Sequence, residues 1–86
     1  MKRLAHDPSL IIKAYSMFEV LYEGVAYSLS TQNRLGPLDI LPGHANMISI
    51  LKDCSVVLDT SSGEKKFNVT QGLLKVSANK VTVFVS

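Results

Sequence analysis

The chain has 86 residues, which is enough for one compact domain. Nine basic and seven acidic residues give a formal net charge of +2, and no basic run exceeds two residues, which excludes the extended basic surface of a nucleic-acid-binding protein. Lys13, Glu19, Glu23, Lys52 and Asp59 interrupt every apolar window well short of the ~20 residues of a membrane span, so no direct membrane insertion is expected.

Residues 1–9 are predicted to form a flexible N-terminal extension, and residues 10–86 a single β-sandwich domain. Lys2-Arg3 is compatible with the start of a signal peptide, but the segment His6-Asp7-Pro8 interrupts the apolar stretch that would have to follow. Export is therefore not expected.

An all-β fold is predicted from residue 10 onward, because short β-rich runs separated by turn residues recur roughly every 8 to 12 residues. Helical periodicity is absent from any window of about 11 residues. We expect a two-sheet β-sandwich of about eight to ten short, mostly antiparallel strands. The strands are predicted at residues 10–16, 20–22, 25–31, 38–40, 47–50, 55–59, 65–70, 73–77 and 80–85.

Residues 32–49 contain two Pro, two Gly and one His in a largely apolar stretch. Pro42 has no N–H and a φ fixed near about −65°, and Gly43 can adopt a positive φ, so Pro42-Gly43 predicts a sharp type II turn. That turn would hold His44 in a fixed position. Two interpretations of the Pro42-Gly43 turn stay open: it serves folding alone, or it contacts a partner. Two also stay open for His44, which either caps nearby backbone or lies at an interface.

The segment Thr60-Ser-Ser-Gly-Glu64 predicts a hairpin tip, in which Gly63 supplies a positive φ. Beyond it, a two-residue loop at Ala78-Asn79 predicts a second hairpin. Its cross-strand pairs would be Val76 with Val81, Lys75 with Thr82, Leu74 with Val83, and Leu73 with Phe84.

One face of this last hairpin would be uniformly apolar, which is typical of a strand pair that packs on a core. On the opposite face, Leu73 and Phe84 form an apolar pair beside the polar Lys75 and Thr82. We predict that Leu73 and Phe84 are covered within the monomer. An intermolecular contact at this pair is the alternative.

Three sequence blocks resemble the epsilon subunit of bacterial and plastid ATP synthases, which is called delta in mitochondria. The first block is Val20-Leu-Tyr-Glu-Gly24, and the second is the stretch from Gly36 to Ala45, which contains the motif Ile-Leu-Pro-Gly-His-Ala. The third block is Phe67-x-Val69-x-x-Gly72-x-Leu-x-Val76-x-x-Asn79-x-Val81-x-Val83. The resemblance spans about Leu10 to Val85. The chain departs from the family pattern at Gln71, where Gly is usual, and near Asp53-Cys54, where Pro-Gly is usual, which leaves the turn geometry there open.

The resemblance implies a non-catalytic rotor subunit of the central stalk, which couples the gamma shaft to the membrane c-ring during proton-driven ATP synthesis. The implied partners are the gamma subunit and the polar loops of the c-ring, and no cofactor or metal is expected. By motif position, Leu41, Pro42, Gly43 and His44 would lie on the gamma side. Gly36, Pro37 and Leu38 would lie on the c-ring side.

The implied location is peripheral, on the cytoplasmic face of a bacterial plasma membrane or on the stromal or matrix face of an organelle membrane. Family members commonly continue into a two-helix hairpin that acts as a regulatory brake, whereas the printed sequence stops at Ser86, so no C-terminal helical hairpin is expected. If residue 86 is the natural end, the protein would have the coupling role and no inhibition by a helical hairpin. If the chain is a shortened one, the regulatory hairpin has been removed.

The residues give little support to classes of function other than a rotor subunit. A single cysteine, Cys54, cannot form an internal disulfide, which favours a reducing compartment. An enzyme would use Cys54 as nucleophile, His44 or His6 as base and Asp39 to orient the imidazole, but nothing in the sequence supports that geometry. A zinc site from His6, His44 and Cys54 lacks any closely spaced ligand pair. A generic intracellular β-sandwich module with an unknown protein partner is the main alternative.

Overall fold

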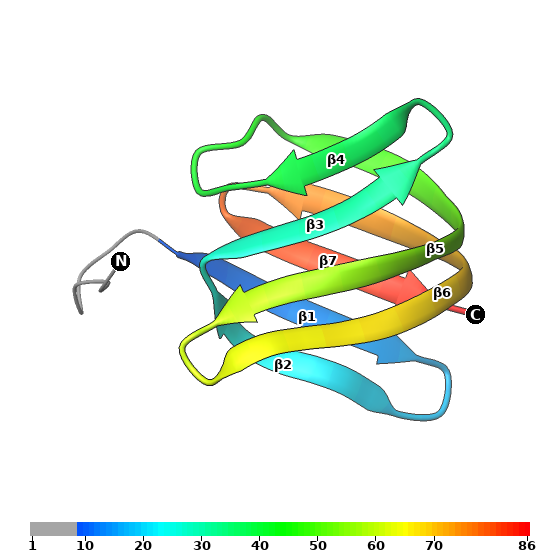
Figure 1. Ribbon diagram of the computed structural model, residues 1–86, viewed down its shortest axis with the longest axis horizontal. Helices are drawn as coiled ribbons and strands as arrows, with labels where there is room; N and C mark the ends of the chain where they lie inside the picture. The colour runs from blue at the N-terminus through cyan, green and yellow to red at the C-terminus, as the bar shows by residue number, and fades with distance from the viewer. Residues whose placement is uncertain (1–8) are drawn as a thin grey trace.

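The computed structural model describes residues 9–86, and in that part of the chain seven strands form one hydrogen-bonded sheet (Figure 1). All-β structure is thereby confirmed. Neighbouring strands pair antiparallel, except for the parallel pair of the first and last strands. In chain order the strands are β1 (Leu10–Ser16), β2 (Val20–Ala26), β3 (Ser28–Asn33), β4 (Gly36–Ile40), β5 (Met47–Thr60), β6 (Gly63–Ser77) and β7 (Lys80–Val85). Residues 1–8 of the predicted N-terminal extension lie outside the described residues.

The order of the strands in the sheet is β2-β1-β7-β6-β5-β3-β4. The sheet folds over on itself, so that it forms the two layers of a sandwich (Figure 1). The first layer contains β2, β1 and β7 with the second part of β6 and the first part of β5, and the second layer contains the remaining parts of β6 and β5 with β3 and β4. Within residues 9–86, no helix has the length and apolar character needed to cross a membrane.

The predicted number of strands was too high, because β5 and β6 each pass through both layers without interruption. The predicted strands 47–50 and 55–59 are both part of β5, and 65–70 and 73–77 are both part of β6. The β5–β6 ladder holds on both sides of Asp53, with Lys52 opposite Gln71 and Cys54 opposite Val69. Asp53 itself has a φ of 49°, a left-handed conformation that turns the strand without ending its pairing.

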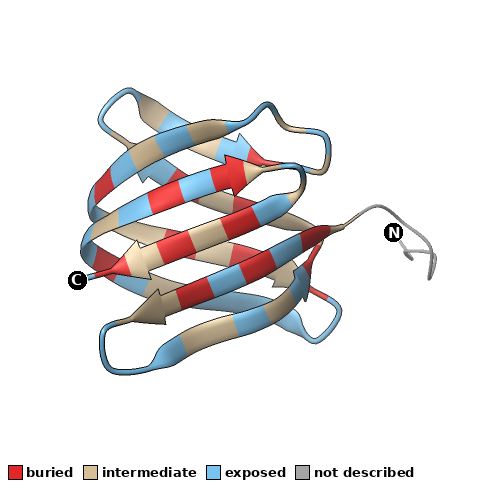
Figure 2. Ribbon diagram, turned by 180° about the vertical axis from the view of Figure 1, so that it is seen from behind, coloured by how far each residue is buried: buried red, intermediate tan, exposed pale blue. Residues whose placement is uncertain are grey.

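The core lies between the two layers and is made of the inward-facing residues, which alternate with outward-facing ones along the strands. Figure 2 shows this alternation as red buried and pale blue exposed positions along the first layer. Burial of each Leu, Ile or Val side chain stabilises the folded state by about 1.5–3 kcal/mol relative to an exposed side chain. Those with the least exposed surface are Leu10, Ile12, Leu29, Ile40, Leu51, Val56, Leu58, Val69, Leu74, Val76, Val81 and Val83.

The predicted register of the β6–β7 hairpin is confirmed, including the pair Leu73 and Phe84. Ala78 and Asn79 both have positive φ, at 49° and 65°, as a type I′ turn requires. The predicted burial of Leu73 was wrong: its side chain is 43% exposed. Phe84 is only partly buried. The physical reason is that both side chains point to the outer face of the first layer, and no other described strand packs on that face.

Candidate functional site

The loop between β4 and β5 carries the residues that the sequence predicted for the gamma side. The amide N–H of His44 donates to the carbonyl oxygen of Leu41 at 3.0 Å, and Gly43 has a φ of 87°. A hydrogen bond from residue i+3 to residue i, with a positive φ at i+2, is the geometry of a type II turn. The predicted turn at Pro42-Gly43 is therefore confirmed.

Two asparagine side chains attach this loop to the distant β6–β7 turn. The N–H of Gly43 donates to Oδ1 of Asn79 at 2.8 Å, and the N–H of Ala78 donates to Oδ1 of Asn46 at 3.0 Å. The paired residues are 36 and 32 positions apart in the chain. Each turn thus supplies the acceptor for an amide of the other, and the loop is held at Gly43 and at Asn46.

The His44 ring makes a local contact with the backbone. Its Nδ1 lies 2.7 Å from the carbonyl oxygen of Ala45, so in the neutral ring Nδ1–H is the donor of this hydrogen bond. The interpretation of His44 as a residue that caps nearby backbone is borne out for this nitrogen. A contact of His44 with a partner stays a prediction.

The residues predicted for the c-ring side belong to β4, which among the described strands is an edge strand that pairs with β3 alone. Pro37 is exposed, whereas Leu38 is partly buried and packs against the core. Gly36 has a φ of 123° and open space where a Cβ would lie. The two predicted contact sites are adjacent along the chain, since the gamma-side loop begins directly after β4 ends.

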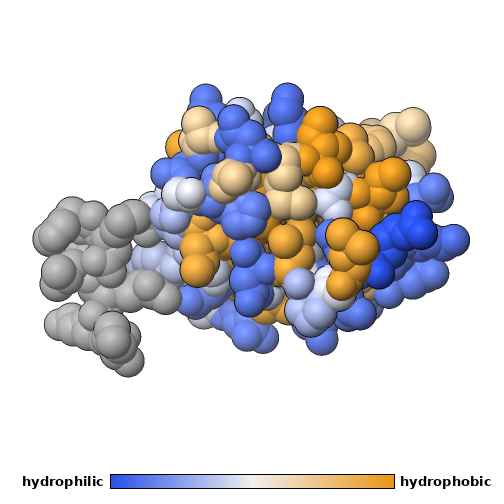
Figure 3. Space-filling view, turned by 90° about the horizontal axis from the view of Figure 1, so that it is seen from above, coloured by the Kyte–Doolittle hydropathy of each residue, from blue (hydrophilic) through white to orange (hydrophobic). Residues whose placement is uncertain are grey.

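Exposed apolar side chains lie within these two sites and on the adjoining segments. Leu41 is one of them, and Leu35 at the tip of the β3–β4 hairpin is almost fully exposed. Ile48 and Ile50 on the first part of β5 are also exposed. The space-filling view from above shows apolar atoms grouped on this side of the molecule (Figure 3). Such groups on a protein surface often mark a contact with a partner.

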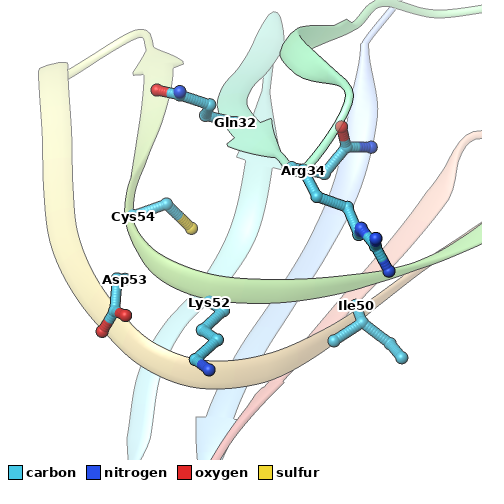
Figure 4. A pocket seen from close by; sticks show the side chains of 7 residues that line it. Gln32, Arg34, Ile50, Lys52, Asp53 and Cys54 are labelled. Atoms are coloured by element: carbon cyan, nitrogen blue, oxygen red, sulfur yellow. The ribbon is translucent and has the colours of Figure 1, made fainter.

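A pocket of about 610 Å³ lies where the β3–β4 hairpin meets the bend of β5 (Figure 4). Arg34 and Lys52 supply two cations to it, and Cys54 supplies a thiol. The remaining lining residues are Gln32, Asn33, Ile50 and Asp53. The wall is tied together by a 3.1 Å hydrogen bond from Nδ2 of Asn33 to Oγ of Ser49.

This pocket does not bring Cys54 together with His44 and Asp39, the residues that an enzyme would use. Cys54 lines the pocket, but His44 and Asp39 do not. His44 precedes the start of β5, and Cys54 lies roughly 20 Å further along that strand at the usual rise per residue. His6 lies outside the described residues. In the part of the chain from residue 9 to 86, no three His, Cys, Asp or Glu side chains are grouped to hold a metal ion.

Sequence reasoning missed a row of apolar side chains on the outer face of the first layer, which we call the apolar row. Ile50 pairs with Leu73, Leu73 with Phe84, Phe84 with Tyr15, and Tyr15 with Val20. The row thus has one member on each of five neighbouring strands. The hairpin pattern pointed to the central Leu73–Phe84 pair, but no sequence signal shows which strands lie on either side of it.

Residues 12–86 match the family model described as ATP synthase, Delta/Epsilon chain, beta-sandwich domain. The chain is 39% identical over 66 residues to the ATP synthase epsilon chain of Xanthomonas campestris pv. campestris (strain B100), covering 76% of this chain and 47% of that protein. It is 36% identical over 76 residues to the ATP synthase epsilon chain of Psychrobacter arcticus, covering 87% of this chain and 55% of that protein. The chain thus spans about half the length of the curated relatives that it matches.

Two solved structures share the fold. One is a cryo-EM structure of the Tetrahymena thermophila mitochondrial ATP synthase, central stalk and c-ring, with a TM-score of 0.77, 15% identity, and coverage of 88% of this chain and 62% of that chain. The other is the Euglena gracilis mitochondrial ATP synthase, OSCP/F1/c-ring, with a TM-score of 0.81, 13% identity, and coverage of 99% and 57%. At these identities the likeness is one of fold alone.

Proposed function

The chain belongs to the ATP synthase delta/epsilon family through its β-sandwich domain, and from this membership we propose that it is a rotor subunit of the central stalk. It would couple the gamma shaft to the c-ring during proton-driven ATP synthesis and would catalyse no reaction itself. The observation that carries this proposal is the family match, which extends over residues 12–86 and so includes almost the whole sandwich.

The structure supplies a physical basis for such a coupling role. A closely packed core deforms little under load. The β4–β5 loop is attached to the β6–β7 turn by the hydrogen bonds of Asn79 and Asn46, so a force on this loop is passed into the sandwich and not lost in loop motion. A rigid domain with a fixed contact loop suits a wedge between a shaft and a ring.

The contact surfaces that we propose are the two sites that β4 and the loop after it provide. Leu41, Pro42, Gly43 and His44 would contact gamma. Gly36, Pro37 and Leu38 would face the polar loops of the c-ring, with Pro37 as the most accessible of the three. The domain would then be held at the membrane peripherally, on the side of the membrane from which the central stalk projects.

The combined variant Leu41→Ala and His44→Ala tests the gamma contact. We expect it to weaken binding to purified gamma subunit by at least about 1 kcal/mol in isothermal calorimetry, the usual threshold for an important interface residue. Val25→Ala is the matched control, because Val25 and Leu41 are both 55% exposed but Val25 lies on the β2 edge. Unchanged affinity of the Leu41/His44 variant, together with an unchanged unfolding midpoint, would sink this assignment.

A further inference from the structure

The tip of the β3–β4 hairpin, residues 33–36, leads into the proposed c-ring site and has little backbone pairing to the rest of the sheet. β3 pairs with β5 from Ser28 to Ser30. Beyond Ser30, the β3 backbone pairs with β4 alone among the described strands. A hairpin attached in this way opens easily about its last backbone pair unless side chains hold it.

Two side chains of β3 hold the tip. Thr31 is buried on the inward face of β3, and alternation along the strand places Asn33 on the same face. The Thr31 hydroxyl donates to the carbonyl oxygen of Ser55 at 2.9 Å. Nδ2 of Asn33 donates to Oγ of Ser49 at 3.1 Å. Thr31 is thus attached to the second part of β5, in its own layer, whereas Asn33 reaches the first part of β5, in the other layer.

Ser49 faces the interior of the sandwich from the first layer. It lies between Met47, which packs against the core, and the fully buried Leu51, and every second residue of a strand shares one face. The hydrogen bond from Asn33 therefore crosses the space between the two layers. It does so on the side of the sandwich where β4 is the edge of the second layer and the first part of β5 is the edge of the first.

The Asn33 side chain has one orientation, because both ends of its amide are used. The N–H of Leu35 donates to Oδ1 of Asn33 at 2.9 Å. A backbone N–H needs an acceptor, so Oδ1 faces Leu35 and the NH2 group faces Ser49. One side chain thus closes the turn at the tip and attaches that turn to the opposite layer.

We infer that Asn33 and Ser49 are positioning residues for the c-ring contact, because their hydrogen bond sets where the start of β4 stands relative to both layers. The bonds of Thr31 and Asn33 reach β5 on opposite sides of the bend at Asp53, beside which the tip lies (Figure 1). A load on the tip therefore passes into both layers. This role rests on the proposed c-ring contact, since Asn33 and Ser49 act through Gly36 to Leu38 and do not themselves belong to that site.

Ser49→Ala tests the attachment in the intact chain, because it removes the acceptor and leaves the turn at the tip in place. Hydrogen exchange at the Leu35 amide, followed by NMR, is expected to accelerate about two- to tenfold, the factor that one lost neutral hydrogen bond gives in an opening equilibrium. Ser49→Thr keeps the hydroxyl and is expected to restore slow exchange. Ser30→Ala is the matched control, since Ser30 is also partly buried but alternates with the inward-facing Thr31.

Binding of the complex between the chain and gamma to a purified c-ring in detergent tests the role of the attachment. Ser49→Ala is expected to weaken c-ring binding about two- to tenfold and to leave the affinity for gamma unchanged. Ser49→Thr and Ser30→Ala are expected to bind both partners as the unsubstituted chain does. General loss of structure would instead lower the urea midpoint and both affinities together.

A double-variant cycle shows that Asn33 and Ser49 act through one bond. Asn33→Ala removes the bond to Ser49 and the acceptor for Leu35, so it is expected to weaken c-ring binding at least as much as Ser49→Ala. Asn33→Ala combined with Ser49→Ala is expected to bind no more weakly than Asn33→Ala alone, because the bond is already absent. Additive losses would mean that the two residues act separately and would overturn the inference.

Two further results would overturn the positioning role alone. Unchanged exchange at Leu35 in Ser49→Ala would mean that other contacts hold the tip. Faster exchange with unchanged c-ring affinity would mean that the place of the tip does not matter for binding. Failure of the unsubstituted complex to bind the c-ring would instead contradict the proposed function, and the positioning role would fall with it.

Discussion

A Cβ atom added at Gly72 would lie 2.6 Å from the carbonyl oxygen of Phe84 on the neighbouring strand. That distance is shorter than any normal contact, and the atom it meets belongs to the backbone of β7, which is held by its own ladder. The same Cβ would also lie 3.1 Å from Cγ1 of the buried Val69. Gly72 is therefore required by close approach of the backbone, and not by a special φ.

Gly72→Ala is expected to lower the free energy of unfolding by about 1–3 kcal/mol, because the added methyl group forces β6 and β7 apart. Urea unfolding followed by circular dichroism measures the effect. Gln71→Ala is the control, since Gln71 is its exposed neighbour and an exposed substitution usually changes stability by less than about 0.5 kcal/mol. Equal stability of both variants would show that the two strands yield easily at this point.

Asn79 combines two roles that different substitutions separate. Its positive φ suits Asn or Gly, and its Oδ1 accepts the hydrogen bond from the N–H of Gly43. Asn79→Gly keeps the turn and removes the acceptor, and it is expected to cost about 0.5–1.5 kcal/mol. Asn79→Asp keeps both the turn and the acceptor, and it is expected to lower the stability by less than Asn79→Gly does. Hydrogen exchange at the Gly43 amide should accelerate in Asn79→Gly alone, and slow exchange there would mean that the loop is held by other contacts.

At the scale of the strands, the bend at Asp53 allows one strand to serve both layers. A non-glycine residue with φ near 49° is uncommon, although Asp tolerates the left-handed region better than most residues. The family pattern has Pro-Gly near this point, and the departure at Asp53-Cys54 leaves the bend intact. The chain thus turns here by the conformation of one residue, while the ladder to β6 continues on both sides.

Asp53→Val is expected to destabilise the fold by about 1–2 kcal/mol, because a β-branched residue is strongly disfavoured at positive φ. Asp53→Gly is expected to change stability by less than about 0.5 kcal/mol, because relief of the backbone strain is offset by the greater freedom of glycine in the unfolded chain. Chemical unfolding of the three proteins under one condition measures the ranking. A valine variant as stable as the glycine variant would contradict a left-handed Asp53.

The two edge strands carry features that oppose pairing with another chain. On β2, the Tyr22 hydroxyl donates to the carbonyl oxygen of Val25 at 2.8 Å, and the Tyr22 ring lies against Gly24. On β4, Pro37 has no N–H to offer. Natural sheets commonly protect their edges in this way.

At the scale of the whole molecule, the two layers are not independent units. β5 and β6 run through both, and the parallel pairing of β1 with β7 joins the two ends of the described chain. A break in either long strand therefore removes pairing from both layers. Small domains with a shared core usually unfold in one cooperative transition.

Single-tryptophan variants test this cooperativity, because the natural chain has no Trp. Tyr15→Trp reports on the first layer and Phe67→Trp on the second. In each variant, tryptophan fluorescence and far-ultraviolet circular dichroism are expected to give the same urea midpoint. Two separate midpoints in either variant would show that one layer melts before the other.

The sequence by itself determined the features that depend on a few neighbouring residues. Short β-rich runs separated by turn residues predicted the all-β fold, and the two-residue loop Ala78-Asn79 predicted the register of the β6–β7 hairpin. Pro42-Gly43 predicted the type II turn, because turn chemistry acts over short distances. The contact roles of Leu41 to His44 and of Gly36 to Leu38 came from the family resemblance and stay predictions.

Tertiary structure decided which distant segments meet. The passage of β5 and β6 through both layers, the attachment of Gly43 to Asn79 across 36 positions, and the alignment of five side chains in the apolar row all require knowledge of the neighbouring strands. The exposure of Leu73 followed the same rule, since alternation showed which face it points to but not that the face is uncovered. Local patterns specify elements, and long-range packing specifies their neighbours.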